Sequence, residues 1–395
     1  IGSFTLAKAF EVHGLHERIA CAILRHKFVT RSPATVLLTM GAICLTFSLF
    51  ISNTATTVMM LPIALSVLKH LDQENEISPL APAMMLMLTW GASFAVGTPV
   101  ATPPNLIGIG QIEQETGISI SFGQWMALAM PIAISMLILG WIVLRLFFLR
   151  KFKMKMPERL DLQGPSHPMS TGEKMTIAIF GLVFAMWLTP DMAKLILGPE
   201  NGFAVWMKSH LTSATAALIG LSLCYILPAK GTPTGRILTW TQGKTIAWGT
   251  VMLFGGGLAL GKALQLSGLT ETMGQFIQSE VGSGSVWTLV LVAAIAVVVM
   301  SELASNTASV TVLVPIIIGV AVSLGLDPVA PAVATTIAGS LGFMLPVSTA
   351  PNAIVYGSGL LPAKTLMKTG VVIDIIGIGV VIFWIWVMLP LLNLG

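Results

Sequence analysis

Long apolar stretches separated by short polar ones dominate the pattern of this chain. An apolar run of about 20 residues is long enough to cross the hydrocarbon core of a bilayer as a helix. Two less apolar stretches, residues 1–32 and 264–284, are amphipathic and predict helices that lie along a membrane surface. Several uninterrupted apolar runs predict membrane-spanning helices at residues 125–149, 175–190, 211–228, 246–263 and 367–392.

Two further apolar stretches, residues 33–69 and 286–323, are each interrupted by the same tripeptide. It stands at Ser52-Asn53-Thr54 in the first stretch and at Ser305-Asn306-Thr307 in the second. Ser, Asn and Thr are preferred N-cap residues, so each tripeptide predicts the end of one helix and the start of the next. We expect each stretch to form a re-entrant hairpin that enters and leaves the membrane on one side.

The apolar stretches at residues 81–112 and 329–360 are interrupted by proline-containing runs. The first run includes Thr102-Pro103-Pro104-Asn105, and the second covers residues 346–352. Proline disrupts a helix interior but suits the first helical position, directly after an N-cap threonine. The pattern therefore predicts two broken helices, each restarting after a threonine, Thr102 or Thr349.

The interruptions belong to an internal repeat. Residues 48–63 and 301–316 agree at seven of sixteen positions, at an offset of 253. Residues 99–105 and 346–352 agree at five of seven positions, at an offset of 247. Near-constant offsets over separate blocks indicate a duplicated structural unit.

The orientation of the two copies follows from counting membrane crossings. Five predicted spans separate the two hairpins, and an odd number of crossings inverts the second copy relative to the first. With residues 1–32 in the cytoplasm, 18 of the 21 Lys and Arg residues fall on the cytoplasmic side, as the positive-inside rule expects. The expected fold is an all-α integral membrane protein, an inverted-repeat transporter with two re-entrant hairpins and two broken transmembrane helices. The first copy has little sequence before it, so we expect the opening spans of a longer protein to be missing.

The composition also indicates a chain that lies in a lipid bilayer. The 395 residues are 55% hydrophobic and 10% charged, whereas soluble domains carry about 25% charged residues. The net charge of +4 is too small to indicate nucleic-acid binding. The polar centre has no nucleophile with a partner base and no cluster of His, Cys, Asp or Glu. We therefore expect neither an enzyme nor a transition-metal site.

The inverted arrangement predicts the chemistry of the centre. Inversion would bring the two tripeptides together near the bilayer midplane, where four helix N-termini with unpaired N–H groups would surround one cavity. Such a site binds an anion without Arg or Lys. Its two similar halves suit a ligand with two negative groups, and sulfate would also fit. The free carbonyl and side-chain oxygens at the same breaks suit a monovalent cation such as Na⁺.

In these motifs the chain resembles the divalent anion/sodium symporter family, specifically its bacterial dicarboxylate transporters. The likeness covers essentially the whole chain. It implies sodium-coupled symport of a small dicarboxylate of the succinate, malate and fumarate class, by an elevator movement within a homodimer in the bacterial inner membrane. The motifs that carry the likeness are Ser52-Asn53-Thr54, Ala101-Thr102-Pro103-Pro104-Asn105, Ser305-Asn306-Thr307 and the run from Phe343 to Val347 that leads to Asn352.

The resemblance also implies which residues bind each ligand. One sodium ion would be bound by Ser48, Ser52, Asn53 and Ala101, and the other by Ser301, Ala304, Asn306 and Ser348. The dianionic substrate would contact Asn53, Thr54, Thr102, Ser305, Asn306, Thr307 and Thr349. The implied domains are an interfacial scaffold arm (1–32), a first half of the transport domain (33–150), a cytoplasmic loop with scaffold spans and an interfacial helix (151–284), and a second half of the transport domain (285–395).

Two asymmetries between the copies leave substrate and coupling open. Where the family usually has Thr-Pro-Pro-Asn, this chain has Thr349-Ala350-Pro351-Asn352, which restores an N–H group at Ala350. Glu302 lies inside the membrane just before the second tripeptide, where its repeat partner is Leu49. An intramembrane acid is a functional candidate, either for proton coupling or for a structural hydrogen bond. A sulfate or citrate transporter and a sodium-independent dicarboxylate exchanger remain alternatives.

Overall fold

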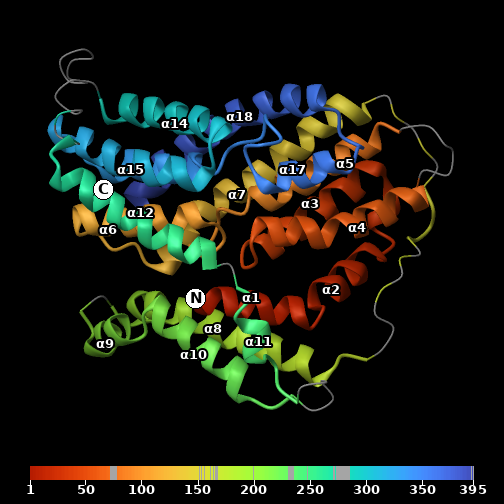
Figure 1. Cartoon of the computed structure of the whole chain (residues 1–395), viewed down its shortest axis with the longest axis horizontal. Helices are drawn as coiled ribbons and strands as arrows, with labels where there is room; N and C mark the ends of the chain where they lie inside the picture. The colour runs from red at the N-terminus through yellow and green to blue at the C-terminus, as the bar shows by residue number, and fades with distance from the viewer. Residues whose placement is uncertain are drawn as a thin grey trace. The chain divides into compact units, whose positions relative to one another are not determined.

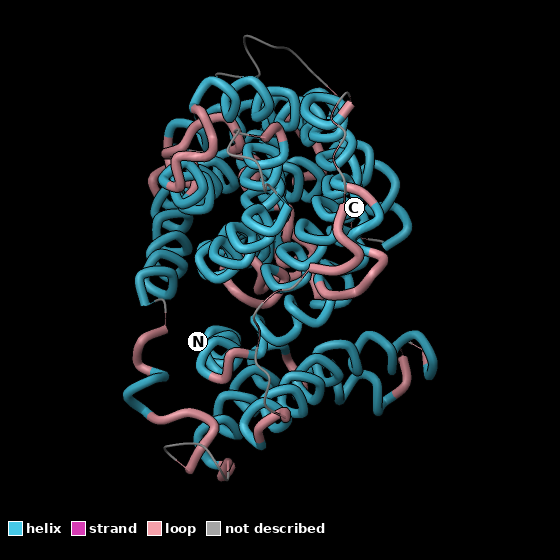
Figure 2. The backbone as a smooth tube through the Cα atoms, turned by 90° about the vertical axis from the view of Figure 1, so that its right-hand side faces the viewer, coloured by secondary structure: helices cyan, strands magenta, loops and turns pink. Residues whose placement is uncertain are grey.

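The computed structural model consists almost entirely of helices over the residues that it describes (Figure 1, Figure 2). The chain divides into two compact units, each assembled from segments far apart in the sequence. The predicted scaffold and transport domains have different boundaries, so their assignment to these units stays a prediction. Unit 1 comprises Ile1–Ala22, Ser121–Met126 and Gln163–Val251, and unit 2 comprises Ile23–Ile120, Ala127–Leu162 and Met252–Gly395. The structure describes all residues except 72–77, 151, 153, 155, 161, 163, 165–167, 199, 230–234, 247, 270–271, 273–284, 393 and 395.

Unit 1 is built around the first helix of the chain, which packs against two later ones. Its helices are α1 (Gly2–Val12), most of α2 (Leu15–Leu24), α8 (Thr171–Leu197), α9 (Gly202–His210), α10 (Ser213–Ile226) and α11 (Trp240–Gly243). Helix α1 contacts α8 and α10. The expectation of one amphipathic helix over residues 1–32 is corrected, because Gly14 adopts φ 64° and separates α1 from α2. A positive φ is not compatible with a continuing right-handed helix.

Unit 2 contains both of the stretches that were predicted as hairpins and both that were predicted as broken helices. The first hairpin stretch forms α3 (Pro33–Ser48) and α4 (Asn53–Leu71), and the first broken stretch forms α5 (Leu80–Ser93) and α6 (Pro103–Thr116). Their counterparts are α14 (Val286–Leu303) and α15 (Asn306–Ser323), followed by α16 (Val329–Ala338) and α17 (Ala350–Gly357). The unit also holds most of α7 (Phe122–Leu144), the π-helix η2 (Arg145–Leu149), the 3₁₀ turn η1 (Val29–Arg31), most of α12 (Trp248–Leu266) and α18 (Ala363–Leu392).

Contacts within unit 2 repeat when the two copies are exchanged. Helix α3 packs on α5 as α14 packs on α16, and α4 packs on α5 as α15 packs on α16. The copies also cross over, because α6 packs on α15 as α17 packs on α4. The internal repeat read from the sequence is therefore matched by a repeated pattern of packing.

An aromatic cluster joins the two copies within unit 2. Phe343, from the second broken stretch, makes an edge-to-face contact with Phe94 at a centroid distance of 5.2 Å and with Trp90 at 6.3 Å. All three rings are buried. Aromatic pairs at these distances add stability beyond the area that they bury, so the cluster holds the first broken stretch against the second.

Six helices in the described part of the chain are long and apolar enough to cross a membrane. They are α4, Phe122–Leu149, α8, α14, α15 and α18, and the bent pair α9 and α10, which meet at 60°, counts as a seventh span if taken together. The span predicted at 246–263 forms α12, which is not among the six, and we attribute this to the polar Lys262 and the glycines 255–257. Most of the amphipathic helix predicted at 264–284 lies outside the described residues.

Candidate functional site

The first tripeptide interrupts its helical stretch where the sequence predicts. Helix α3 ends at Ser48 and α4 begins at Asn53. The hydroxyl of Ser52 accepts the backbone N–H of Ala55 at 3.2 Å. This is the N-cap bond expected of a serine directly before a helix, and it leaves the N–H groups of the first two residues of α4 without intrahelical partners.

The second tripeptide has the same local geometry. Helix α14 ends at Leu303, and Ser305 is the N-cap of α15. The Ser305 hydroxyl accepts the N–H of Ala308 at 3.1 Å. The predicted interruption is therefore confirmed in both copies, and in both the serine caps the second helix.

Each broken stretch is folded by an asparagine that follows the break. The side-chain amide of Asn105 donates to the carbonyl oxygens of Val96 and Thr98, at 3.0 and 2.8 Å. In the second copy Asn352 donates to the carbonyl of Leu345 at 3.0 Å. A buried amide that satisfies carbonyls of its own connecting segment fixes the path of an irregular backbone.

The two predicted threonine caps behave differently. Thr349 accepts the N–H of Asn352 at 3.2 Å, as an N-cap should. Thr102 occupies the N-cap position of α6, but its hydroxyl makes no cap bond, and its Oγ1 is buried with no partner among the described residues. Pro103 and Pro104 carry no N–H, so two of the donors near the start of α6 are absent.

Two residues of the first predicted sodium set have buried side-chain oxygens that lack a protein partner among the described residues. Ser48 is fully buried, and its Oγ has no hydrogen-bond partner among the described residues. The Oδ1 atom of Asn53 is in the same situation. Ala101 is also buried, and Ser52 uses its hydroxyl as the N-cap. No hydrogen bond of the described residues joins Ala101 to Ser48 or Asn53. Buried polar atoms are almost always satisfied by protein, water or an ion, so two orphaned oxygens here suit a bound cation.

Three residues of the second predicted sodium set, Ser301, Asn306 and Ser348, lie together in the structure. The Ser301 hydroxyl lies 2.6 Å from Asn306 Oδ1 and 3.0 Å from the carbonyl oxygen of Gly339. One hydroxyl proton therefore faces two oxygen acceptors. Ser348 belongs to the same cluster, because a side chain added at Gly342 would meet Ser301 Oγ, Asn306 Oδ1 and Ser348 Cβ within 4 Å. Ala304, the fourth member of the predicted set, is the C-cap of α14.

Sequence reasoning missed the central residue of this cluster. Gly342 lies where an added Cβ would come within 3.2 Å of Ser301 Oγ and Asn306 Oδ1, a tight contact for any side chain. Its carbonyl oxygen accepts from the hydroxyl of Ser348 at 2.8 Å and from the side-chain amide of Asn352 at 3.1 Å. The available signal was a glycine shortly before the second proline-containing run, but one sequence offers no way to separate it from other glycines.

The predicted substrate residues differ in exposure. Thr54 and Ser305 are exposed, Asn53, Asn306, Thr307 and Thr349 are partly buried, and Thr102 is buried. The N-termini of α4 and α15 belong to helices that pack against α17 and α6 of the opposite copy. Helix N-termini carry partial positive charge and unpaired N–H groups, which suits a small anion.

One acidic side chain comes shortly before the second tripeptide, and another lies beside it. Glu302 is 4% exposed, and its two carboxylate oxygens accept the backbone N–H groups of Met344 and Leu345, at 2.7 and 2.9 Å. Asp374 of α18 is also buried and lies beside Glu302 and Phe343. The structural hydrogen-bond role that the sequence left open for Glu302 is therefore present.

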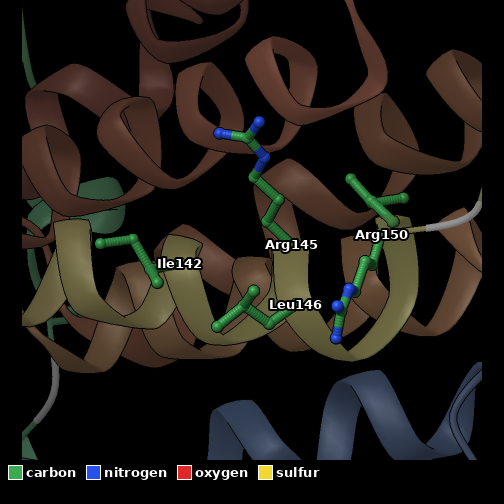
Figure 3. Close-up of a pocket in the computed structure, with 5 residues that line it drawn as sticks. Ile142, Arg145, Leu146 and Arg150 are labelled. Carbon is green, nitrogen blue, oxygen red and sulfur yellow. The ribbon is translucent and has the colours of Figure 1, made fainter.

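A separate hollow of about 310 Å³ lies at the end of α7, away from the two tripeptides in sequence. It is lined by Ile142, Arg145, Leu146, Leu149 and Arg150. Figure 3 shows that the guanidinium groups of Arg145 and Arg150 point in different directions. The two cations therefore do not converge on one ligand position, and this hollow contributes none of the predicted site residues.

The comparisons with known proteins all find transporters. The profile of the family described as "Sodium:sulfate symporter transmembrane region" matches residues 1–392. The sodium-dependent dicarboxylate transporter SdcS of Staphylococcus saprophyticus is 31% identical over 406 residues, which cover 99% of this chain and 76% of that protein. SdcS of Staphylococcus aureus is 31% identical over 408 residues, with the same shares.

A solved structure is similar in fold. The crystal structure of the YdaH transporter of Alcanivorax borkumensis, reported to have an unusual topology, matches with a TM-score of 0.64 at 15% identity. The match covers 100% of this chain and 85% of that chain. At this identity the likeness shows that the two proteins share an arrangement of helices.

Proposed function

Because this chain belongs to the sodium:sulfate symporter family, we propose that it carries a small dicarboxylate of the succinate, malate and fumarate class across the membrane together with sodium. Membership of the family confirms two predictions, that the chain is an integral membrane transporter and that it is not an enzyme. The observation that carries the proposal is the duplicated tripeptide, which in both copies starts a helix at a serine cap and lies beside oxygens suited to a cation.

Sodium coupling is supported by the chemistry of the two oxygen clusters. Ser48 Oγ and Asn53 Oδ1 are buried acceptors without protein partners among the described residues. In the other copy Ser301 Oγ, Asn306 Oδ1 and the Gly339 carbonyl lie together with a single hydroxyl proton between them. Neutral oxygens of this kind suit a hard monovalent cation. The proposed ligands are those named above, with Ser52 and Ala101 completing the first site and Ala304 and Ser348 the second.

The anion would be held between the copies by groups that carry no formal charge. The N-termini of α4 and α15 offer unpaired N–H groups beside Asn53, Thr54, Asn306 and Thr307. Helix N-termini bind carboxylates without a basic side chain. Sodium ions bound next to them would add positive charge at short range. The printed names of the two staphylococcal relatives, which specify sodium and dicarboxylate, favour this substrate class.

The proposal includes an inverted repeat that moves as an elevator. Support comes from the packing of unit 2, in which the contacts of α5 with α3 and α4 are matched by those of α16 with α14 and α15, and α6 and α17 each pack on the hairpin of the opposite copy. In this arrangement α3 with α4, and α14 with α15, would be the two re-entrant hairpins. The homodimer remains part of the proposal, with the scaffold domain as its interface.

Uptake of radiolabelled succinate into proteoliposomes tests the proposal. We expect uptake in an inward sodium gradient and none when choline replaces sodium. Competition by malate and fumarate is expected, with weaker competition by citrate and sulfate. Preferred inhibition by sulfate or citrate would support those substrates instead, and uptake in choline would support the sodium-independent exchanger.

The asparagines of the two tripeptides test the site within the same assay. Asn53→Ala removes Oδ1 from the first cluster, and Asn306→Ala removes the acceptor that lies 2.6 Å from Ser301 Oγ. Each variant should lose sodium-dependent uptake while the protein stays folded and elutes as the wild type does. Full activity of either variant would remove that asparagine from the site.

A further inference from the structure

Glu302 connects the second tripeptide to the break in the second broken stretch. It is the second-last residue of α14 and follows directly after Ser301, a proposed sodium ligand. Its two carboxylate oxygens accept the N–H groups of Met344 and Leu345, which lie between Gly342 and Ser348. Hydrogen bonds to an ionised carboxylate are shorter and stronger than neutral ones. One side chain thus joins the two chain segments that supply the second cluster of oxygens.

The first copy has a connection between the corresponding positions, in which the break again donates and the hairpin again accepts. The hydroxyl of Thr98 donates to the backbone carbonyl oxygen of Leu49. At the repeat offsets of 253 and 247, Leu49 corresponds to Glu302 and Thr98 corresponds to Leu345. In the first copy the break supplies the side chain and the hairpin supplies the backbone, and in the second copy these roles are exchanged.

We propose that Glu302 and Thr98 are positioning residues, each of which holds a hairpin end against a broken helix so that the oxygens of the neighbouring sodium site keep their spacing. This inference rests on the proposed sodium coupling. The proposal assigns sodium contact to the neighbouring oxygens, and it assigns to Glu302 and Thr98 only the bonds that they make to the backbone of the opposing segment. The exchange of roles explains how a leucine and a glutamate occupy equivalent positions.

Glu302 and the backbone that it binds are packed closely against helix α18. Helix α18 lies so close that a side chain at Gly370 would collide with the carbonyl oxygen of Phe343 at 2.3 Å. Asp374, one turn further along α18, is buried next to Glu302. The backbone at Phe343 therefore packs closely against α18, beside the buried side chains of Glu302 and Asp374.

The sodium dependence of uptake at saturating succinate tests the inference. Glu302→Gln replaces one acceptor oxygen by an NH₂ group that faces a backbone N–H. We expect the sodium concentration for half-maximal uptake to rise about tenfold, as the loss of one buried hydrogen bond would cause. The maximal rate and the succinate KM at saturating sodium should stay near the wild-type values. Glu113→Gln is the matched control, because Glu113 is an exposed acid of the same unit, on α6.

Two substitutions of Thr98 give an independent test in the first copy. Thr98→Val keeps the shape and removes the donor, whereas Thr98→Ser keeps the donor. We expect a similar rise in half-saturating sodium for the valine variant and near wild-type behaviour for the serine variant. A purely structural role would lower the folded yield of the valine variant and leave the sodium curve of the folded protein unchanged.

The outcomes separate this inference from the proposed function. Wild-type uptake that needs no sodium would remove the function, whatever the variants do. Sodium-dependent wild-type uptake with an unchanged sodium curve in folded Glu302→Gln and Thr98→Val would overturn the positioning role alone. If Glu302→Gln does not fold, Glu302→Asp, which keeps the charge with a shorter reach, replaces it. Failure of both to fold would assign Glu302 to fold stability and overturn its positioning role.

Discussion

At Gly342, adding a single methyl group should weaken sodium binding while the protein still folds. A Cβ added there would lie 3.2 Å from Asn306 Oδ1, 3.2 Å from Ser301 Oγ and 3.7 Å from Ser348 Cβ. The first two distances are shorter than ordinary contacts between carbon and oxygen. Gly342→Ala therefore places an apolar group among the oxygens that we propose hold the second sodium ion.

The size of the effect follows from the packing. Adding a methylene to a tightly packed site costs about 1–3 kcal/mol. If this strain falls on the ion-bound arrangement, sodium binding weakens by about 5- to 150-fold. The backbone of Gly342 is outside the left-handed region, so alanine adds no strain in φ there. Alanine also restricts the unfolded chain more than glycine does, which limits the loss of overall stability.

The assay is the sodium dependence of succinate uptake in proteoliposomes, with thermal unfolding in detergent as the check on folding. Gly379→Ala is the matched control, because a Cβ at this α18 position would meet nothing within 4 Å. We expect a large rise in half-saturating sodium for Gly342→Ala and none for Gly379→Ala. A folded Gly342→Ala protein with the wild-type sodium curve would refute the proposed grouping of Ser301, Asn306 and Ser348 around an ion.

Three further predictions concern stability, measured by unfolding in detergent. Arg18→Met leaves the carboxylate of Glu173 without its guanidinium partner at 2.6 Å, although Glu173 keeps the N–H of Ser170. The loss should cost about 1–3 kcal/mol. A loss no larger than that of Lys8→Met, which breaks a more exposed pair, would contradict this. Ser305→Ala removes the cap of α15 and should cost about 1 kcal/mol, with Ser305→Thr close to wild type; equal losses in both would show that the cap bond does not matter. Burial lowers the pKa of His16 below its ordinary value of 6.5, so the unfolded chain binds the proton more readily and stability should fall as the pH drops below about 6.5. His16→Leu should reduce this fall, and an identical pH profile in the variant would disprove the contribution of His16.

Local chemistry made much of this fold predictable. At each tripeptide one helix ends and the next begins: α3 and α4 at the first, α14 and α15 at the second. The serine before the second helix satisfies an N–H group of its first turn, and this local bond does not depend on the rest of the chain. The broken helices were predictable for a similar reason, since proline removes a donor at a fixed place. The internal repeat then predicted that both copies would pack alike.

Contacts between distant segments were not predictable from one sequence. Thr102 stands at the predicted N-cap, but its hydroxyl makes no cap bond, because side-chain orientation is decided by the tertiary surroundings. Gly342 comes within reach of Ser301 only through the packing of α14 on α16. Glu302 was recognisable as a buried acid, yet its partners, Met344 and Leu345, lie more than forty residues further along.

The central claim is that movement of the dicarboxylate is coupled to movement of sodium. The most direct test is the steady-state ratio of internal to external succinate in proteoliposomes clamped at zero membrane potential, measured over a series of inward sodium gradients. Coupled symport predicts that succinate accumulates above its external concentration and that the ratio rises with the sodium gradient. A ratio that stays at one for every gradient, with succinate still entering, would contradict the account.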